Sequence, residues 1–305
     1  MEITAKAVAA LRAKTGIGMM DCKKALVEAQ GNEEEAIKIL REKGLAVAAK
    51  KSTRIAAEGL VSILLDEATH TAAMIEVNIE TDFAAKNAVF GEFVDDLLNI
   101  ILKTRPATVE ELLKKDFKDG LDVEAALKDK IFTIGENINI RRFVIVDGAA
   151  SSYVHGKGNI GVVAKMTKTM DNPVFAEAAK NVCLQAAAMN PLYLDPASVP
   201  ASVVEKEKEI IASQIKNDPA NSKKPEQVIE KMVQGKLNKF YSTNCLTEQT
   251  YVKDDKLTVG KYIASVAKEI GEDFGIAQFV RYEKGEGLEK KEDNFAEEIA
   301  KLTAK

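Results

Sequence analysis

The stretch "GLVSILLDEATHTAAMIEVNIE", residues 59–80, contains two apolar runs separated by the polar segment "DEATHT". In the second run Ile75, Val77 and Ile79 alternate with polar residues. Alternation with a period of two is typical of a strand that buries one face, and two such runs around a polar turn are typical of a β-hairpin. The stretch therefore predicts a β-hairpin.

A helix is predicted directly after this hairpin, because apolar residues recur at helical spacing between positions 89 and 101. A weaker copy of the strand and the helix lies 85 residues further on, as "NIGVVAKMTKTMD" and "NPVFAEAAKNVCLQAAAM". In this alignment Val89 and Phe90 correspond to Val174 and Phe175. We infer two related halves, each built from a β-hairpin and a helix.

The two halves differ where the strand leads into the helix. The first has "ETDFAAKN", residues 80–87, and the second has "KTMDNP", residues 168–173. Residues at the ends of elements are less constrained by packing, so function is often found there. Two interpretations are open: Asp82 caps the helix and Phe83 packs against the strand as a hydrophobic staple, or the pair forms a tip that enters a partner.

The first 44 residues predict three short helices, each ended by a glycine that favours a left-handed backbone. Thr4 is suited to cap the first helix, the second spans about residues 21–30, and Asn32 with Glu35 resembles a capping box at the start of the third. The three terminating residues are Gly16, Gly31 and Gly44. The small, basic stretch "AVAAKKSTRIAA", residues 46–57, then predicts a linker or a short solvated helix.

The stretch "TGIGMMDCKKAL", residues 15–26, places Met19 and Met20 in a loop that enters the second helix. Methionine is an adaptable contact residue that suits protein interfaces. The alternative is that one or both methionines fill the core of the three helices. Lys23 is most simply part of a solvated face.

Residues 201–242 contain two apolar stripes at helical spacing around the polar turn "NDPANSKKPE". This pattern predicts an antiparallel helical hairpin. Such a hairpin either protrudes and pairs with another chain or packs back on its own domain. The remaining chain predicts a helix over residues 262–270, a strand at "AQFVRY", residues 277–282, and a last helix after Asn294.

Several classes of function lack their sequence signatures. The glycines of "GKGNIG", residues 156–161, precede a strand-like run, so they predict a hairpin turn and not a dinucleotide site. A protein kinase is excluded because neither His70 nor His155 is followed by Arg-Asp. Two histidines so far apart, and cysteines without a Cys-x-x-Cys pair, make a metal site improbable. We expect no metal and no cofactor.

The charge pattern and hydropathy indicate the kind of partner. The net charge of −4 argues against nucleic-acid binding through a bulk positive field. Residues 1–55 carry a balance of +4, however, so the remainder carries −8. A mildly basic head on an acidic body suits a protein partner of mixed charge. Without an apolar run of membrane-spanning length or a signal-peptide pattern, the expected location is the cytoplasm.

Five stretches, in order along the whole chain, resemble the translation elongation factor Ts family: "TGIGMMDCKKAL", "IEVNIETDFAAKN", "IGENINIRR", "YVHGKGNIGVV" and "KGEGLEKKEDNFAEE". The combination is far more specific than any one stretch. The resemblance implies a guanine-nucleotide exchange factor for elongation factor Tu, which has no active site of its own. It also implies contacts with the GDP-bound and nucleotide-free partner, and no direct contact with nucleic acid or membrane.

The resemblance assigns site residues. The family motif T-D-F-V, which inserts beside the Mg²⁺ site of the GTPase, corresponds to Thr81, Asp82, Phe83 and Ala84, where alanine replaces the usual valine. Phe83 would act as a wedge, and Asp82 would perturb the Mg²⁺ surroundings. The part of the family that grips the GTP-binding domain corresponds to the head, with Met19, Met20 and Lys23. His155 corresponds to the region that reaches a β-domain of the partner.

The predicted fold class is α+β, with a three-helix head that the resemblance makes ubiquitin-associated-like. The other parts are two related α/β subdomains and a helical-hairpin extension. The expected boundaries are residues 1–55 for the head and linker, 56–140 for subdomain N, 141–200 with 243–284 for subdomain C, 201–242 for the hairpin, and 285–305 for a C-terminal helical module. A homodimer could form through the hairpin. Two rival functions stay open: a ubiquitin-associated-like adaptor or chaperone, and an enzyme with an unrecognised site.

Overall fold

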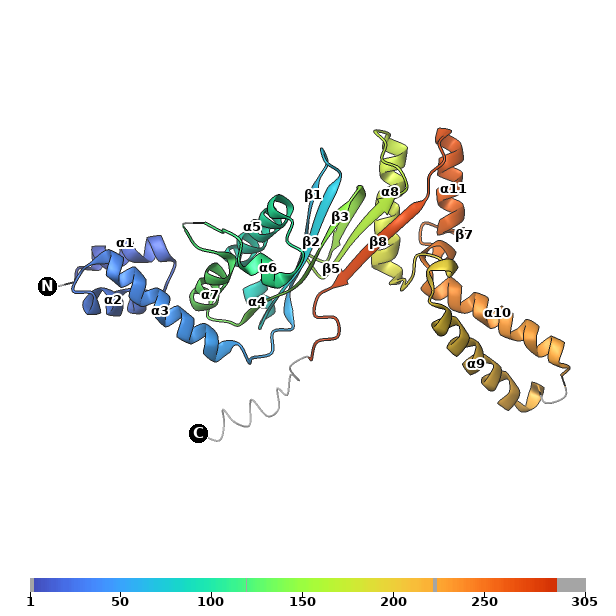
Figure 1. Cartoon of the computed structure of the whole chain (residues 1–305), viewed down its shortest axis with the longest axis horizontal. Coiled ribbons are helices and arrows are strands. Elements are labelled where there is room, and N and C mark those ends of the chain that lie inside the picture. The colour runs from blue at the N-terminus through green and yellow to red at the C-terminus, as the bar shows by residue number, and fades with distance from the viewer. Residues whose placement is uncertain (1–2, 119, 222–223, 290–305) are drawn as a thin grey trace.

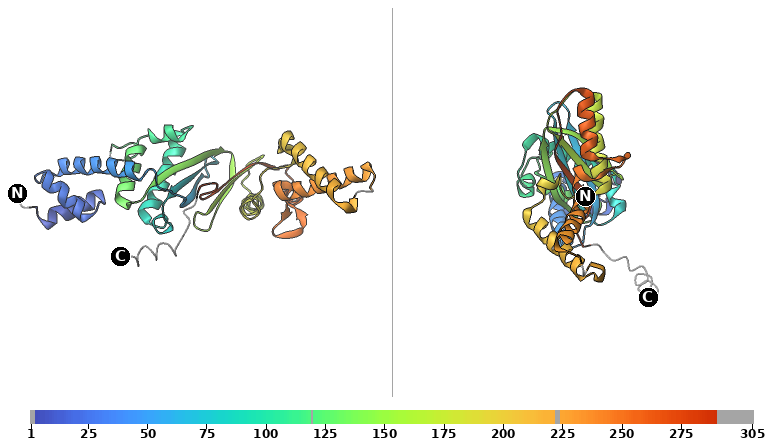
Figure 2. Two further views of the ribbon diagram at one scale, coloured as in Figure 1. Left: turned by 90° about the horizontal axis from the view of Figure 1, so that it is seen from below. Right: turned by 90° about the vertical axis from the view of Figure 1, so that its right-hand side faces the viewer.

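The computed structural model describes residues 3–118, 120–221 and 224–289. It has the predicted α+β fold, with a helical N-terminal region, two three-stranded antiparallel sheets and a long helical hairpin. The molecule is elongated, with the first three helices at one end and the hairpin at the other (Figures 1 and 2). The sheets and the helices that cover them lie between these ends.

Three helices form the head, and their caps follow the sequence. The Thr4 side chain accepts a hydrogen bond from the Ala7 amide, Gly16 ends the first helix with φ of 68°, and the Asn32 side chain caps the third. Leu11, at 0% exposure, lies in the small apolar core that the three helices share. The helices are α1 (Ala5–Thr15), α2 (Met19–Glu28) and α3 (Glu33–Lys51).

The third helix is longer than predicted. It continues through Gly44 to Lys51, so the prediction of a stop at Gly44 is wrong, and residues 46–51 are helical. The reason is tertiary: Gly44 is buried where α3 packs on α7 (Val123–Ile134), and a β-carbon here would lie 3.5 Å from Phe132, an ordinary van der Waals distance. Ala48 is buried in the core of the first sheet. The helix α3 therefore joins the head to the body directly.

The predicted hairpin at residues 59–80 is present and forms two strands of the first sheet. This sheet has the order β1–β2–β3, and its central strand is buried along its whole length. One face carries the core with α5, whose apolar stripe includes Phe90 and Phe93. The elements are β1 (Glu58–Asp66), β2 (Thr71–Ile79), β3 (Ile138–Asp147), α4 (Asp82–Ala85), α5 (Ala88–Thr104) and α6 (Val109–Leu113).

The second sheet has the order β4–β5–β8, and "GKGNIG" forms the predicted turn between its first two strands. Helices α8 and α11 contribute to its core, which includes Phe175 and Ile263. The predicted strand at "AQFVRY" is β8. The elements are β4 (Ala149–His155), β5 (Ile160–Met166), α8 (Pro173–Met189), α11 (Val259–Ile270) and β8 (Ile276–Glu283). Strands β6 (Thr250–Tyr251) and β7 (Asp254–Thr258) form a separate two-stranded antiparallel sheet.

The two sheets pack against each other through a shared apolar cluster that includes Met74 and Val163. Their contact is close, because the Val61 amide donates a hydrogen bond of 2.8 Å to the Gly158 carbonyl. A β-carbon on Gly161 would lie 2.5 Å from a Val61 methyl, so only glycine fits there. The glycines of the "GKGNIG" turn thus serve packing between the sheets.

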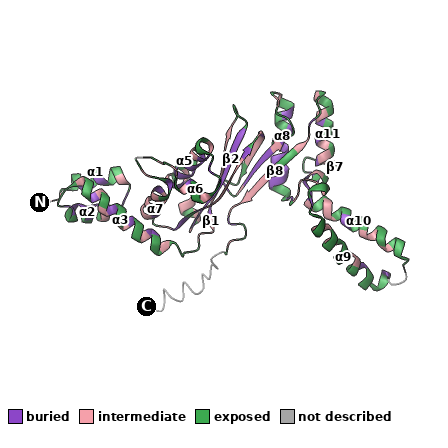
Figure 3. Cartoon of the chain, in the orientation of Figure 1, coloured by how far each residue is buried: buried purple, intermediate pink, exposed green. Residues whose placement is uncertain are grey.

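The helical hairpin projects from the body and does not pack back on it (Figure 1). Its two helices are α9 (Ala201–Asn217) and α10 (Glu226–Asn244), which are mostly exposed (Figure 3). A small core that contains Ile211, Ile215 and Leu237 holds them together. Short 3-10 turns occur at Pro196–Ser198, Pro219–Asn221 and Leu246–Glu248. The helix predicted after Asn294 lies outside the described residues.

A buried carboxylate ties the C-terminal turn to the first sheet. Glu76 of β2 is 0% exposed and accepts hydrogen bonds from Arg141 Nη1 at 2.9 Å, Arg142 Nε at 2.7 Å and the Gly285 amide at 2.8 Å. The Arg142 guanidinium also lies 4.0 Å from the centre of the Tyr282 ring. Charged and hydrogen-bonded partners offset the cost of burying the Glu76 charge.

Acidification is expected to remove the stabilisation that Glu76 provides. Burial would raise the pKa of this carboxyl, but hydrogen bonds from the Gly285 amide and two guanidiniums outweigh burial and hold the pKa below its ordinary value of 4.5. The contribution to folding is therefore complete above about pH 4.5 and is lost as the pH falls through the lower folded-state pKa. Urea unfolding from neutral pH down to about pH 3.5 measures this loss. Glu76→Gln should show a shallower decline, and an identical decline would contradict the assignment.

Candidate functional site

The corner after β2 contains one extra turn of helix, α4, before α5 begins. Thr81 caps α4, because its hydroxyl accepts a hydrogen bond from the Ala84 amide at 3.2 Å. Asn87 caps α5 by accepting from the Val89 amide at 2.9 Å. Asp82 is the first residue of α4, so the prediction that Asp82 caps the helix is wrong.

A comparison of the two halves shows that an asparagine, and not Asp82, is the repeated cap of the long helix. In the second half Asn172 accepts hydrogen bonds from the Val174 and Phe175 amides and so caps α8. Asn87 and Asn172 are 85 residues apart, the same offset that relates the two helices. The repeated cap was visible in "NAVF" and "NPVF". The residues of α4 have counterparts at the same offset of 85, but those counterparts, residues 167–170, are not helical.

Phe83 does not pack against the strand. Its side chain is 83% exposed, which is the largest fraction among the exposed large apolar residues of the described chain. The staple interpretation is therefore wrong. The Nζ of Lys86 lies 5.6 Å from the centre of the ring. An exposed aromatic ring on a short, anchored helix is suited to insertion into a partner, because aromatic side chains are enriched in the central contacts of interfaces.

Asp82 carries its charge at neutral pH beside this ring. Its carboxylate accepts a hydrogen bond of 2.6 Å from Lys86 Nζ, one turn along. That bond is the largest influence on the pKa of Asp82. Together with the positive charge of Lys86 and a bond from the Phe83 amide, it outweighs desolvation and holds the pKa below its ordinary value. The tip thus presents an aromatic ring flanked by an ionised carboxylate and an ammonium group.

The base of the tip is fixed to the body on two sides. Ala84 and Ala85 are partly buried against the core of the first sheet. The Glu136 carboxylate accepts hydrogen bonds from the Thr81 amide at 2.9 Å and from the Thr81 hydroxyl at 2.7 Å. Ala84 thus contributes its methyl group to the packing beneath the tip.

In the head, Met19 and Met20 belong to the first turn of α2 and not to a loop. They are 41% and 63% exposed, so the alternative that they fill the core is wrong. Lys23 is exposed, as predicted. The sequence analysis missed Val27, which is 57% exposed and lies seven residues after Met20, on the same face of α2. An apolar residue at that spacing from Met20 was the available signal.

His155 ends β4 and is exposed. Its Nδ1 lies 2.9 Å from the Tyr153 hydroxyl, and the two atoms are hydrogen-bonded. His70 lies at the other end of the same strand, since its carbonyl accepts a bond from the Ala149 amide. The two histidines therefore do not form a pair. Lys284 links the tip to the turn after His155, because its charge acts on Asp82 and its amide donates a hydrogen bond of 2.8 Å to the Asn159 carbonyl. Helices α1 and α2 lie at one end of the molecule (Figure 1).

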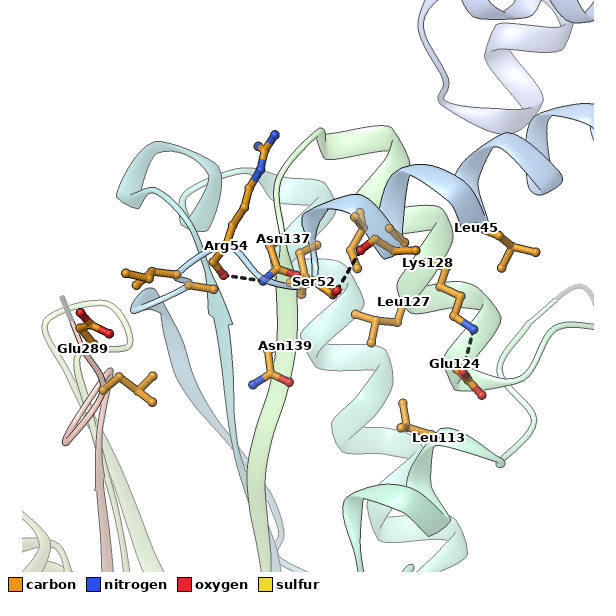
Figure 4. Close-up of a pocket in the computed structure, with 17 residues that line it drawn as sticks. Leu45, Ser52, Arg54, Leu113, Glu124, Leu127, Lys128, Asn137, Asn139 and Glu289 are labelled. Carbon is orange, nitrogen blue, oxygen red and sulfur yellow. Dashed lines mark hydrogen bonds and ion pairs between the residues drawn. The ribbon is translucent and has the colours of Figure 1, made fainter. Parts of the chain in front are cut away.

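The described residues contain no group of three or more His, Cys, Asp or Glu side chains arranged to hold a metal ion. Burial raises the pKa of Cys183 to about 12 and that of Cys245 to about 11, so both thiols are protonated at neutral pH. A surface cavity of about 700 Å³ lies between α3, α7 and β3 (Figure 4), and none of the predicted site residues lines it. Among the described helices, none has the length and apolar character needed to span a membrane.

The sequence of the chain is similar to that of known proteins. Residues 80–286, which include α4 and the Glu136 anchor, match the family model described as elongation factor TS. The chain belongs to the elongation factor Ts family. It is similar to the elongation factor Ts of Clostridium botulinum (strain Eklund 17B / Type B), with 47% identity over 306 positions that cover 99% of this chain and 100% of the relative.

A second elongation factor Ts, from Clostridium kluyveri (strain ATCC 8527 / DSM 555 / NBRC 12016 / NCIMB 10680 / K1), is 49% identical over 304 positions, covering 98% of each chain. That of Clostridium perfringens (strain SM101 / Type A) is 46% identical over 99% of this chain. The likeness therefore extends over the head, both sheets and the hairpin. Membership in the elongation factor Ts family makes this chain a translation elongation factor.

Proposed function

We propose that this chain binds GDP-bound elongation factor Tu and accelerates GDP release, with Asp82 and Phe83 as the residues that act on the nucleotide site. The observation that carries the proposal is the exposed Phe83 ring, on a helical turn whose base is anchored by Thr81 and packed through Ala84. Exposing a large aromatic ring to water is unfavourable, so a folded chain that does so on a rigid mount is suited to bury the ring elsewhere.

In the proposed mechanism Phe83 enters between structural elements of the partner, and Asp82 acts on the surroundings of the partner's Mg²⁺. Magnesium requires near-ideal octahedral geometry, so small displacements of its ligands weaken nucleotide binding sharply. By linkage, a factor that lowers GDP affinity is itself bound less tightly when GDP is present, by the same ratio. The chain would stabilise the empty partner until GTP displaces it. This requires no covalent chemistry, so we propose a binding protein and not an enzyme.

The head and the second half would supply affinity. Met19, Met20 and Lys23 form an exposed face with apolar and basic character, which suits a contact with the GTP-binding domain of the partner. His155, exposed at the end of β4, would contact a different part of the partner. In this division the distant contacts hold the partner, and the tip performs the displacement.

Release of a fluorescent GDP analogue from elongation factor Tu tests the function. Micromolar wild-type chain should accelerate release severalfold or more when unlabelled GDP is in excess. An unchanged release rate would refute the proposal, and binding without acceleration would favour the adaptor.

Repeating the assay in EDTA tests the role of Mg²⁺. The acceleration should shrink, because the chelator already removes the Mg²⁺ whose surroundings the tip would disturb. Full acceleration in EDTA would contradict the magnesium step.

Replacing Met20 with serine is expected to weaken binding without lowering the maximal release rate. The concentration of factor at half-maximal stimulation should rise about fivefold, which corresponds to ~1 kcal/mol. Titrating the factor in the release assay separates these two quantities. Val252→Ser, at a 47% exposed residue far from the head, is the control and should behave as wild type. A lowered maximal rate with unchanged half-saturation would contradict the assignment of Met20 to binding.

A further inference from the structure

The turn that follows α7, residues 135–137, contacts both the tip and the end of α3. Glu136 binds the amide and hydroxyl of Thr81 at 2.9 and 2.7 Å. Asn137, which is 7% exposed, donates its side-chain amide to the Arg54 carbonyl at 2.8 Å (Figure 4). Lys51, the last residue of α3, donates to the Gly135 carbonyl. One short turn therefore connects the helix of the head with the corner after β2.

The tip depends on such an anchor because α4 has only four residues. A helix this short is unfavourable on its own, since nucleation fixes several backbone dihedrals for few hydrogen bonds. Its orientation must come from contacts with the rest of the chain. Ala84 and Ala85 provide apolar packing, and Glu136 provides the hydrogen bonds at its N-terminal end.

The two bonds to Glu136 fix Thr81 in the geometry that capping requires. The Thr81 hydroxyl donates its single proton to Glu136, which leaves its oxygen free to accept from the Ala84 amide at 3.2 Å. The bond from the Thr81 amide to the same carboxylate holds the backbone at the entry to α4. Without Glu136 the exposed hydroxyl would be free to rotate, and the backbone that carries Asp82 and Phe83 would lose a fixed point.

We infer that Glu136 is a positioning residue that holds the Asp82–Phe83 tip in the orientation needed for GDP release. The inference rests on the proposed exchange function and assigns Glu136 a role through Thr81, without contact to the partner's nucleotide. The residues on either side of Glu136, Gly135 and Asn137, bind Lys51 and Arg54 at and just after the end of α3, so the backbone that carries Glu136 is itself held in place. The rate of a step that depends on a precisely placed group falls steeply when that group moves by about 1 Å, so a loosened anchor should lower the release rate even if the tip residues are intact.

The test is Glu136→Ala in the full chain, assayed by release of the fluorescent GDP analogue over a range of factor concentrations. The maximal stimulated rate should fall about tenfold. The concentration at half-maximal stimulation should stay within about twofold of wild type, because the head contacts are unchanged.

Glu136→Gln should recover part of the rate, since its carbonyl oxygen still accepts from the Thr81 hydroxyl while its amide cannot accept from the Thr81 N–H. The thermal midpoint of both variants should stay close to that of wild type, which separates loss of positioning from loss of fold.

Two further variants sharpen the result. Glu124→Ala removes an exposed carboxylate on the neighbouring α7, where it pairs with Lys128 at 2.6 Å (Figure 4), and should leave the rate unchanged. Thr81→Ala should lower the rate, and adding Glu136→Ala to it should cause no further loss, because the two residues act as one unit.

The outcomes are distinguishable. If wild-type chain fails to accelerate release, the proposed function falls and the inference falls with it. If wild type accelerates release and Glu136→Ala does so equally well at saturation, only the inference is overturned. A full additional tenfold loss in the Thr81→Ala background would also overturn it, since Glu136 would then act independently of Thr81.

Discussion

Phe83→Ala is expected to lower the maximal rate of factor-stimulated GDP release by about 30- to 700-fold. Truncating a central aromatic contact in an interface typically costs about 2–4 kcal/mol, and every 1.4 kcal/mol is a factor of ten. The cost should appear in the maximal rate, because the ring is assigned to the displacement step and not to initial binding. Release of a fluorescent GDP analogue at saturating factor measures the effect.

The same substitution should leave stability almost unchanged. Phe83 is 83% exposed, and substitutions at exposed positions usually change the free energy of unfolding by no more than about 0.5 kcal/mol. Phe90→Ala, seven residues further on, is the matched contrast. Its ring is 0% exposed in the core of the first sheet, so the same truncation should cost about 3–5 kcal/mol. A large fall in the thermal midpoint of Phe83→Ala would contradict the expectation that this exposed ring contributes little to stability.

Glu76→Ala is expected to reduce the free energy of unfolding by about 3–5 kcal/mol, the usual cost of removing one partner from a buried ion pair. The substitution would leave Arg141, Arg142 and the Gly285 amide without their shared acceptor. Urea unfolding at neutral pH measures the change. The control is Glu92→Ala, at an exposed carboxylate on α5, which should change stability by less than about 0.5 kcal/mol.

Loss of Glu76 should also affect how the two halves are joined, because its network connects the C-terminal turn to the first sheet. Arg142 contacts Glu76 on β2 and also Glu286 at 3.3 Å. Lys284 pairs with Glu58 at the start of β1. Losing Glu76 should therefore loosen the turn that closes the second half onto the first. If Glu76→Ala unfolds at the wild-type urea concentration, the network contributes no net stability and this interpretation is wrong.

The sequence drew attention to Asp82 and Phe83 but did not predict the contacts that hold them in place. It identified Asp82 and Phe83 as unusual because the second half keeps the same corner without that pair. It could not decide between a cap and a tip, since both use an acid and an aromatic ring at a strand end. The exposed fraction of Phe83 ruled out the staple, and the cap positions of Thr81 and Asn87 ruled out Asp82 as the cap. Nothing near Thr81 in the sequence indicates Glu136, which lies 55 residues away.

By itself the sequence determined the features that depend on neighbours within about four residues. Hydrogen bonding and side-chain direction in helices and strands are local. Such local features include the alternating run at residues 75–79, the helical stripe of α5, and the caps at Thr4 and Asn32. Only the tertiary structure decided the features that depend on distant groups. Helix α3 continues past Gly44 because it packs on α7 and places Ala48 in the core of the first sheet, and Glu76 is buried because arginines from β3 and an amide from the C-terminal turn reach it. The free energy of these contacts comes from groups that meet only after the chain has folded.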